Sequence, residues 1–181
     1  AQHRHQIGDR AGAARLHEGV AAAQPDNHTI WALLEPAWRM TGDRRHEWLI
    51  GQPGLYGAID LALGEGQLPA IADALRTLHV ASSQPLGQSV RGGTQTSGDL
   101  FTRGDAQIRP LVDALAGAIR QFHAMLPPAD PTHPFLKFRD RNITFGPSWS
   151  VRLTGGGFHT AHYHPGGFLS SACYVSVPET L

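Results

Sequence analysis

Only one of the 181 residues is a cysteine, Cys173. A single cysteine excludes an internal disulfide framework and a zinc ribbon built from cysteines, and it fits a reducing, cytoplasmic environment. An excess of one charge is also missing, because 15 Lys and Arg balance 15 Asp and Glu. This balance indicates neither a nucleic-acid partner nor electrostatic binding to an anionic membrane.

Long hydrophobic runs are absent as well. No apolar run approaches the roughly 18 residues that a membrane helix requires, and the N-terminus lacks the basic, then apolar pattern of a signal peptide. No Gly-x-Gly-x-x-Gly turn follows a strand pattern, and no His-Glu-x-x-His motif occurs. The sequence starts with Ala1 rather than Met, so we expect further chain upstream.

Histidine is the residue type that stands out, with eleven copies, three of them at positions 159, 162 and 164. Side chains on an extended backbone alternate between two faces, so His162 and His164 would point the same way and could bind one metal ion. His159 has the opposite parity. It is predicted to support the site, although the neighbouring glycines could break the alternation and make it the alternative ligand.

The segments around the histidines are rich in strand formers. Residues 148–153 alternate between polar and apolar side chains, and Gly155, Gly156 and Gly157 then free the backbone. A turn is predicted at 165–167, followed by a strand over 168–177 that Pro178 ends. Arg152 shares the polar face of its strand, which fits either a surface charge or a cation in a pocket.

The run SWSVRLTGGGFHTAHYHPGGFLSSACYVSVP at 148–178 resembles the metal-binding half of 2-oxoglutarate/Fe(II)-dependent oxygenases. It is most similar to a bacterial group in which the oxygenase follows tetratricopeptide repeats. The similarity also takes in QPLGQSVRGGTQTSGDLF at 84–101, so it covers most of the chain beyond about residue 50. The resemblance implies an α+β chain that ends in a double-stranded β-helix, a jelly-roll or cupin-like barrel that is incomplete at Leu181.

The resemblance also implies roles for individual residues. His162 matches the first metal ligand, and His164 stands where a carboxylate is usual, so a site of three histidines would carry less negative charge. Ser170-x-x-x-Tyr174-Val175 looks like the Thr-x-x-x-Tyr-Leu of prolyl-hydroxylase-like members, in which the tyrosine binds the far carboxylate of 2-oxoglutarate. The implied cofactors are Fe(II), 2-oxoglutarate as co-substrate, and O₂. The distal histidine and the basic residue that pairs with the same carboxylate are expected beyond Leu181.

The first fifty residues have the pattern of paired helices. Gly8-Asp9 recurs 34 residues later as Gly42-Asp43, and 34 residues is the period of a tetratricopeptide repeat. One helical face lies before Pro25-Asp26 and another starts near Trp31. We predict a repeat-like segment at 1–50 that binds a protein or peptide partner, and an oxygenase domain at 51–181. A generic helical hairpin is the alternative.

Two further helices are predicted between these regions. Leu68-Pro69 opens one, with an apolar stripe of Ile71, Leu75 and Leu78, and a second over 108–122 is expected to lie on a sheet. The segment 84–101 is predicted to be a loop. Arg91 or Gln95 in this loop could contact substrate, or the loop could be purely structural. Its single Arg-Gly-Gly is weak support for RNA binding.

The leading functional hypothesis is a 2-oxoglutarate- and Fe(II)-dependent dioxygenase that hydroxylates a protein, a peptide or a small molecule. One alternative is a non-catalytic repeat scaffold with a degenerate metal site. Another is a cupin-like metalloenzyme that does not use 2-oxoglutarate.

Overall fold

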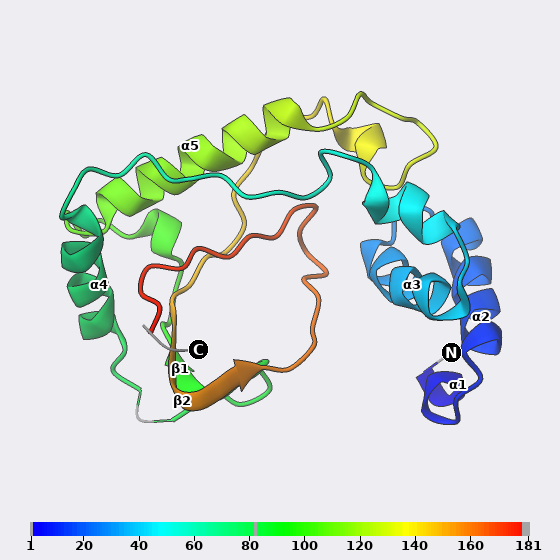
Figure 1. Cartoon of the computed structure of the whole chain (residues 1–181), viewed down its shortest axis with the longest axis horizontal. Coiled ribbons are helices and arrows are strands. Elements are labelled where there is room, and N and C mark those ends of the chain that lie inside the picture. Colours follow the sequence, from blue (N-terminus) through cyan, green and yellow to red (C-terminus); the bar gives the residue numbers. More distant parts are fainter. Residues whose placement is uncertain (1, 82, 179–181) are drawn as a thin grey trace. The chain divides into compact units, whose positions relative to one another are not determined.

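The structure, a computed structural model, describes residues 2–81 and 83–178. Most of the regular secondary structure in these residues is helical, and a small antiparallel sheet accompanies the helices (Figure 1). The elements in chain order are α1 (Gln2–Gln6), α2 (Arg10–Ala23), α3 (His28–Thr41), the π-helical turn η1 (Glu47–Gly51), α4 (Gln67–Leu78), β1 (Val90–Gln95), the 3₁₀ turn η2 (Leu100–Thr102), α5 (Arg109–Met125), the 3₁₀ turn η3 (Leu136–Phe138) and β2 (Val151–His159). This mixture is compatible with the predicted α+β class. No helix in the described ranges is both long and apolar enough to cross a membrane.

The chain divides into two compact units. The first, called the helical unit below, comprises Ala1–Ala58, Phe122–Asn142 and Tyr163–Leu169; the second, called the sheet unit, comprises Ile59–Gln121, Ile143–His162 and Ser170–Leu181. Each unit therefore combines segments far apart in the sequence. The predicted domain division at residue 50 stays a prediction.

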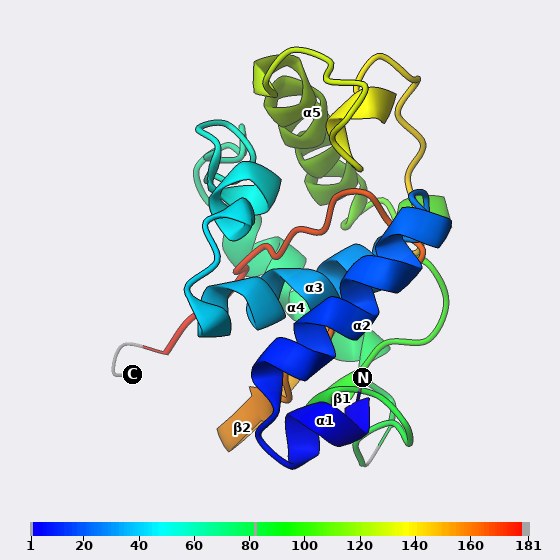
Figure 2. The same cartoon turned by 90° about the vertical axis from the view of Figure 1, so that its right-hand side faces the viewer.

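The helical unit is built on the hairpin of α2 and α3, which pack against each other (Figure 2). Their apolar faces meet in a buried cluster of Ala14, Ala21, Leu34, Ala37, Trp38 and Leu49. Small residues on α2 let α3 approach closely, and the helix pair predicted from the sequence is confirmed.

The two Gly-Asp corners share one backbone geometry. Gly8 and Gly42 both have positive φ, +79° and +71°. The amide of the following aspartate donates to a carbonyl five residues earlier, from Asp9 to Arg4 at 2.8 Å and from Asp43 to Trp38 at 2.9 Å. This is the helix-ending pattern in which glycine takes the left-handed position at no steric cost. The sequence repeat therefore corresponds to a structural repeat of the corner, while a tetratricopeptide array stays a prediction.

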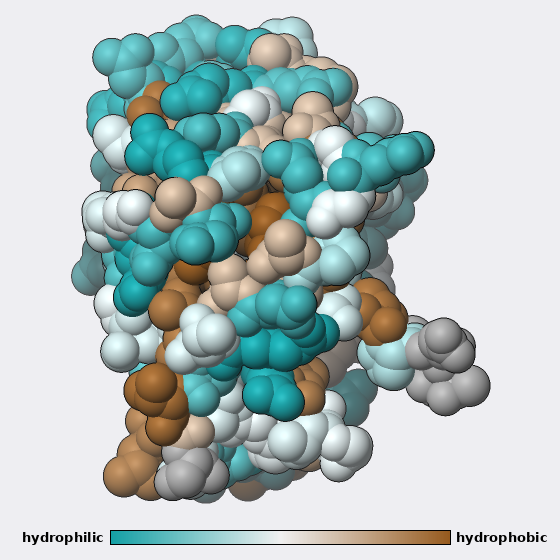
Figure 3. Space-filling model, turned by 90° about the vertical axis from the view of Figure 1, so that its left-hand side faces the viewer, coloured by the Kyte–Doolittle hydropathy of each residue, from teal (hydrophilic) through white to brown (hydrophobic). Residues whose placement is uncertain are grey.

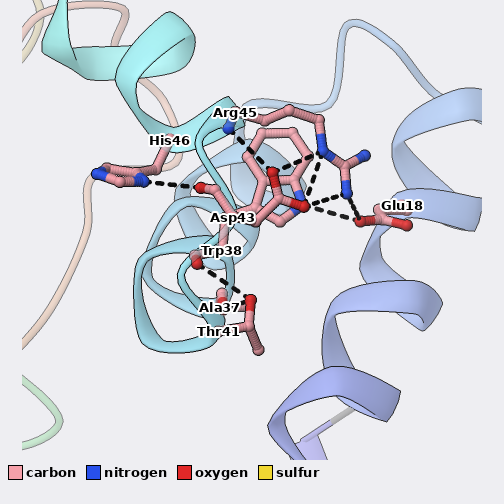
Figure 4. Close-up of polar contacts among 7 residues, drawn as sticks. All are labelled: Glu18, Ala37, Trp38, Thr41, Asp43, Arg45 and His46. Atoms are coloured by element: carbon pink, nitrogen blue, oxygen red, sulfur yellow. Dashed lines mark hydrogen bonds and ion pairs between the residues drawn. The ribbon is translucent and has the colours of Figure 1, made fainter.

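A polar network closes the helix hairpin beside the second corner (Figure 4). The Trp38 indole N–H donates to Glu18 Oε1 at 2.8 Å, and the Arg45 guanidinium lies 4.5 Å from the centre of the Trp38 ring. Arg45 also forms ion pairs with Glu18 and Asp43. Hydrogen bonds from Arg45 lower the pKa of Asp43 to about 2, so Asp43 stays ionised at neutral pH and holds Arg45 over the indole.

The sheet unit has its own apolar core. Ile71 and Leu75 of α4 are buried with residues of η2 and of the start of α5, and the full buried cluster is Ile71, Leu75, Leu100, Ile108, Leu111 and Val112. The predicted helices at 68–78 and 108–122 are confirmed. The expectation that the second would lie on a sheet is wrong, because its apolar stripe packs against α4 and η2.

The sheet pairs β1 with β2, and Val90 lies opposite His159. The register shifts between Arg91 and Gly93, where β2 accommodates extra residues. A side chain at Gly157 would lie 2.3 Å from the main-chain oxygen of Gly92, and one at Gly93 would lie 2.6 Å from that of Arg152. Gly93 of the Arg-Gly-Gly stretch and Gly157 of β2 are therefore needed for close strand contact.

Two sequence expectations about strands are corrected by this pairing. The segment 84–101 is not a simple loop, because it contains β1 and η2. Residues 168–178 follow an irregular path rather than the predicted strand. The predicted double-stranded β-helix is not confirmed, since the described residues pair only two strands.

Large apolar side chains stay at the surface along β2 and after it. The exposed fractions are 55% for Phe158, 52% for Val177 and 81% for Tyr174. Figure 3 shows hydrophobic side chains at the surface among hydrophilic ones. An antiparallel pair of strands on its own buries little apolar area, which explains the exposure of Phe158.

Candidate functional site

The histidine segment begins where the sheet ends. His159 is the last residue of β2, and the backbone from Thr160 to His164 is irregular. The predicted turn follows, closed by a hydrogen bond of 3.3 Å from the Gly167 amide to the His164 carbonyl. Since β2 ends at His159, the side-chain alternation of a strand does not orient His162 and His164.

His159 and His162 lie close together. Their ring centres are 5.6 Å apart and the ring planes are inclined by 28°. His159 Nδ1 lies 2.9 Å from Ser89 Oγ, and His162 Nδ1 lies 2.9 Å from the Thr160 carbonyl oxygen. A carbonyl oxygen only accepts, so Nδ1 of His162 carries a proton in this contact. A histidine that donates from Nδ1 binds a metal through Nε2.

His164 belongs to the helical unit, because the unit boundary falls between His162 and Tyr163. The prediction that His162 and His164 share a metal ion therefore stays a prediction. Of the three clustered histidines, His159 and His162 belong to the same unit.

The other predicted site residues lie on the sheet unit. Arg152 is an exposed residue of β2 opposite Thr94. Ser170 and Tyr174 are exposed on the irregular segment after the turn. Their neighbours Val175 and Ser176, together with α4, line an open cavity of about 250 Å³.

No sequence pattern indicated the polar cluster that surrounds His79. His79 Nδ1 lies 2.8 Å from Thr94 Oγ1, and Nε2 lies 3.1 Å from Ser150 Oγ. Burial lowers the pKa of His79, and the positive charge of Arg152 lowers it further. The contact with Ser150 spans 71 residues, and no local motif predicts such a pairing. The imidazole links the end of α4 to β1 and to the residue that precedes β2.

Comparison with known families gives one match, to the family described as "Putative 2OG-Fe(II) oxygenase", over residues 147–181. The matched segment contains all three clustered histidines as well as Arg152, Ser170 and Tyr174. No curated protein and no solved structure matches the chain. The family match supports the oxygenase resemblance of this segment and suggests an oxygenase function.

Such a family implies Fe(II) and 2-oxoglutarate. The imidazoles of His159 and His162 are suitable donors for Fe(II). Within residues 2–81 and 83–178, however, no three His, Cys, Asp or Glu side chains come together as a metal site. The described residues thus provide nitrogen donors but do not fit a site of three protein ligands.

Proposed function

We propose that the protein is a 2-oxoglutarate- and Fe(II)-dependent dioxygenase that hydroxylates a C–H bond of a protein, a peptide or a small molecule. The observation that carries this proposal is the family match over residues 147–181. The segment contains the densest histidine cluster of the chain, and His162 presents the tautomer suited to metal binding. Fe(II) and 2-oxoglutarate would supply the oxidation, in which O₂ is consumed and succinate and CO₂ are released.

In this proposal His162 and His164 bind the metal. Tyr174 and Ser170 bind the co-substrate, as their match to the Thr-x-x-x-Tyr motif implies. His159 supports His162 or replaces His164 as a ligand, and Arg152 provides a positive charge near the site.

The helical unit would present a protein or peptide partner, as in the bacterial group with tetratricopeptide repeats. The matching corners at Gly8-Asp9 and Gly42-Asp43 support a repeated helix pair. Binding of a labelled peptide library to the chain, compared with a variant that lacks residues 1–50, tests this role. Equal binding by both proteins would remove it.

Anaerobic titration with Co(II), followed by its absorption spectrum, tests the ligands. We expect the site to be lost in His162→Ala and in His164→Ala and retained, with about tenfold weaker binding, in His159→Ala. His123→Ala, a substitution on α5, is the matched control. Undiminished binding by the double variant His162→Ala/His164→Ala would contradict the ligand assignment.

Succinate formation tests the reaction itself. A protein that contains this chain should release succinate from 2-oxoglutarate only with Fe(II) and O₂, and the His162→Ala variant should not. Metal binding without turnover of 2-oxoglutarate would favour the cupin-like alternative. If the protein neither binds the metal nor forms succinate but still binds peptides, the repeat scaffold is favoured.

A further inference from the structure

Ser89, the residue before β1, contacts the end of β2 through both its side chain and its main chain. Its Oγ lies 2.9 Å from His159 Nδ1. Its carbonyl oxygen accepts hydrogen bonds from the Thr160 amide at 2.9 Å and from Thr160 Oγ1 at 3.3 Å. The strand register, with Val90 opposite His159, is what places Ser89 beside Thr160.

Two connections lead from Ser89 to His162. In the first, Ser89 fixes the His159 ring, which stacks 5.6 Å from the His162 ring. In the second, Ser89 holds the Thr160 peptide, whose carbonyl oxygen accepts the Nδ1 proton of His162. His162 lies on irregular backbone and is exposed.

We propose that the Ser89 side chain is a positioning group for the histidine cluster: its hydroxyl fixes His159 directly and His162 through His159. The role of the cluster in binding a metal rests on the proposed function; the orientation of the rings does not. Partners of this kind fix the tautomer and the direction of a ligating imidazole, and their loss typically costs ten- to a hundredfold in metal affinity.

The metal-free protein gives the first test. ¹⁵N NMR of the histidine rings distinguishes Nδ1-protonated from Nε2-protonated imidazole. We expect His162 to be Nδ1-protonated in the unsubstituted protein and to become a mixture of tautomers in Ser89→Ala. Ser89→Thr keeps the hydroxyl and should restore the original spectrum. Ser97→Ala, at an exposed serine after β1, should leave it unchanged.

Metal affinity gives the second test. Ser89→Ala should weaken Co(II) binding about tenfold, and Ser89→Thr and Ser97→Ala should not. The Ser89 hydroxyl acts through His159, so Ser89→Ala should cause no further loss when it is combined with His159→Ala. If Co(II) affinity falls about another tenfold in the double variant relative to His159→Ala, the hydroxyl does not act through His159.

An unchanged His162 tautomer in Ser89→Ala would overturn the positioning role. If the unsubstituted protein does not bind Co(II), the proposed function fails. The NMR spectra of the metal-free protein still decide the role of Ser89. A loss of thermal stability in Ser89→Ala without a change in tautomer would show a purely structural contribution and would equally overturn the proposal.

Discussion

His133 Nε2 donates a hydrogen bond of 3.0 Å to the carbonyl oxygen of Leu49, 84 residues earlier in the chain. His133 Nδ1 accepts from the amides of Phe135 and Leu136, both at 3.1 Å. The side chain is 1% exposed, so the ring is neutral with its proton on Nε2. One imidazole thereby ties η1 to the returning segment of the helical unit.

Removal of this imidazole should destabilise the helical unit. His133→Ala leaves two amides and the Leu49 carbonyl without this partner and opens a cavity, so we expect a loss of about 3 kcal/mol in unfolding free energy. Urea denaturation followed by circular dichroism measures the loss. His46→Ala is the control, because the half-buried His46 ring contacts the nearby Asp43 carbonyl rather than a distant segment, and it should cost less than about 1 kcal/mol. Equal losses would contradict the linking role of His133.

The same residue should make stability depend on pH. Burial lowers the pKa of His133 below its ordinary value, so the unfolded chain takes up a proton more readily than the folded one. The stabilisation is complete above the unfolded pKa of about 6.5 and is lost as the pH falls from there towards the lower folded pKa. Between pH 7.5 and 5.5 the unsubstituted protein should therefore lose more stability than His133→Ala. Parallel pH profiles would exclude His133 as the source.

The contact between Glu18 and Trp38 should contribute to the helix hairpin. Glu18→Ala removes the acceptor of the part-buried indole N–H and one ion pair of Arg45. We expect a loss of about 1 to 2 kcal/mol, since the indole hydrogen bond contributes more than an exposed ion pair. Glu47→Ala, which breaks only the exposed pair with Arg44, should change stability by less than about 0.5 kcal/mol. Denaturation with urea compares the two variants.

Close strand contact should make Gly157 intolerant of a side chain. In Gly157→Ala the new methyl group would lie 2.3 Å from the Gly92 oxygen, so the strands must separate at the bulge. Gly155→Ala is the matched control, because nothing lies within 4 Å of its methyl position. Hydrogen exchange of the β1 and β2 amides should accelerate at least tenfold in Gly157→Ala and stay near the original rate in Gly155→Ala. Unchanged protection in Gly157→Ala would contradict the observed register.

The role proposed for Tyr174 can be tested through its hydroxyl. In a protein that contains this chain, Tyr174→Phe should raise the concentration of 2-oxoglutarate needed for succinate formation and leave Co(II) binding unchanged. The loss of one hydrogen bond to a carboxylate corresponds to about a tenfold increase. An unaltered requirement would remove Tyr174 from the co-substrate site.

Local features of the sequence were sufficient for the helices and turns. The spacing of Ile71 and Leu75 predicts α4, the recurring Gly-Asp pairs indicate a repeated helix pair, and Pro165-Gly166 predicts the turn after the histidines. Each of these depends on residues within a few positions of one another, where the intrinsic preferences of glycine, proline and apolar stripes act directly.

The strands and the site contacts could not be predicted in the same way. A strand needs a partner for its amides and carbonyls, so the β-forming pattern at 168–177 was not sufficient, while the glycine-rich 90–95 pairs with β2. For the same reason local patterns did not indicate the links of Ser89 to His159 or of His133 to Leu49, which span 70 and 84 residues.

The sequence by itself determined where the helices and turns form, that the charges balance, and that three histidines cluster beside a turn. Only the tertiary structure decided which histidines lie together, which tautomer His162 adopts, and why glycines are required at the bulge. These properties depend on atoms brought together by strand pairing and core packing, and such long-range contacts are set by the whole chain rather than by neighbouring residues.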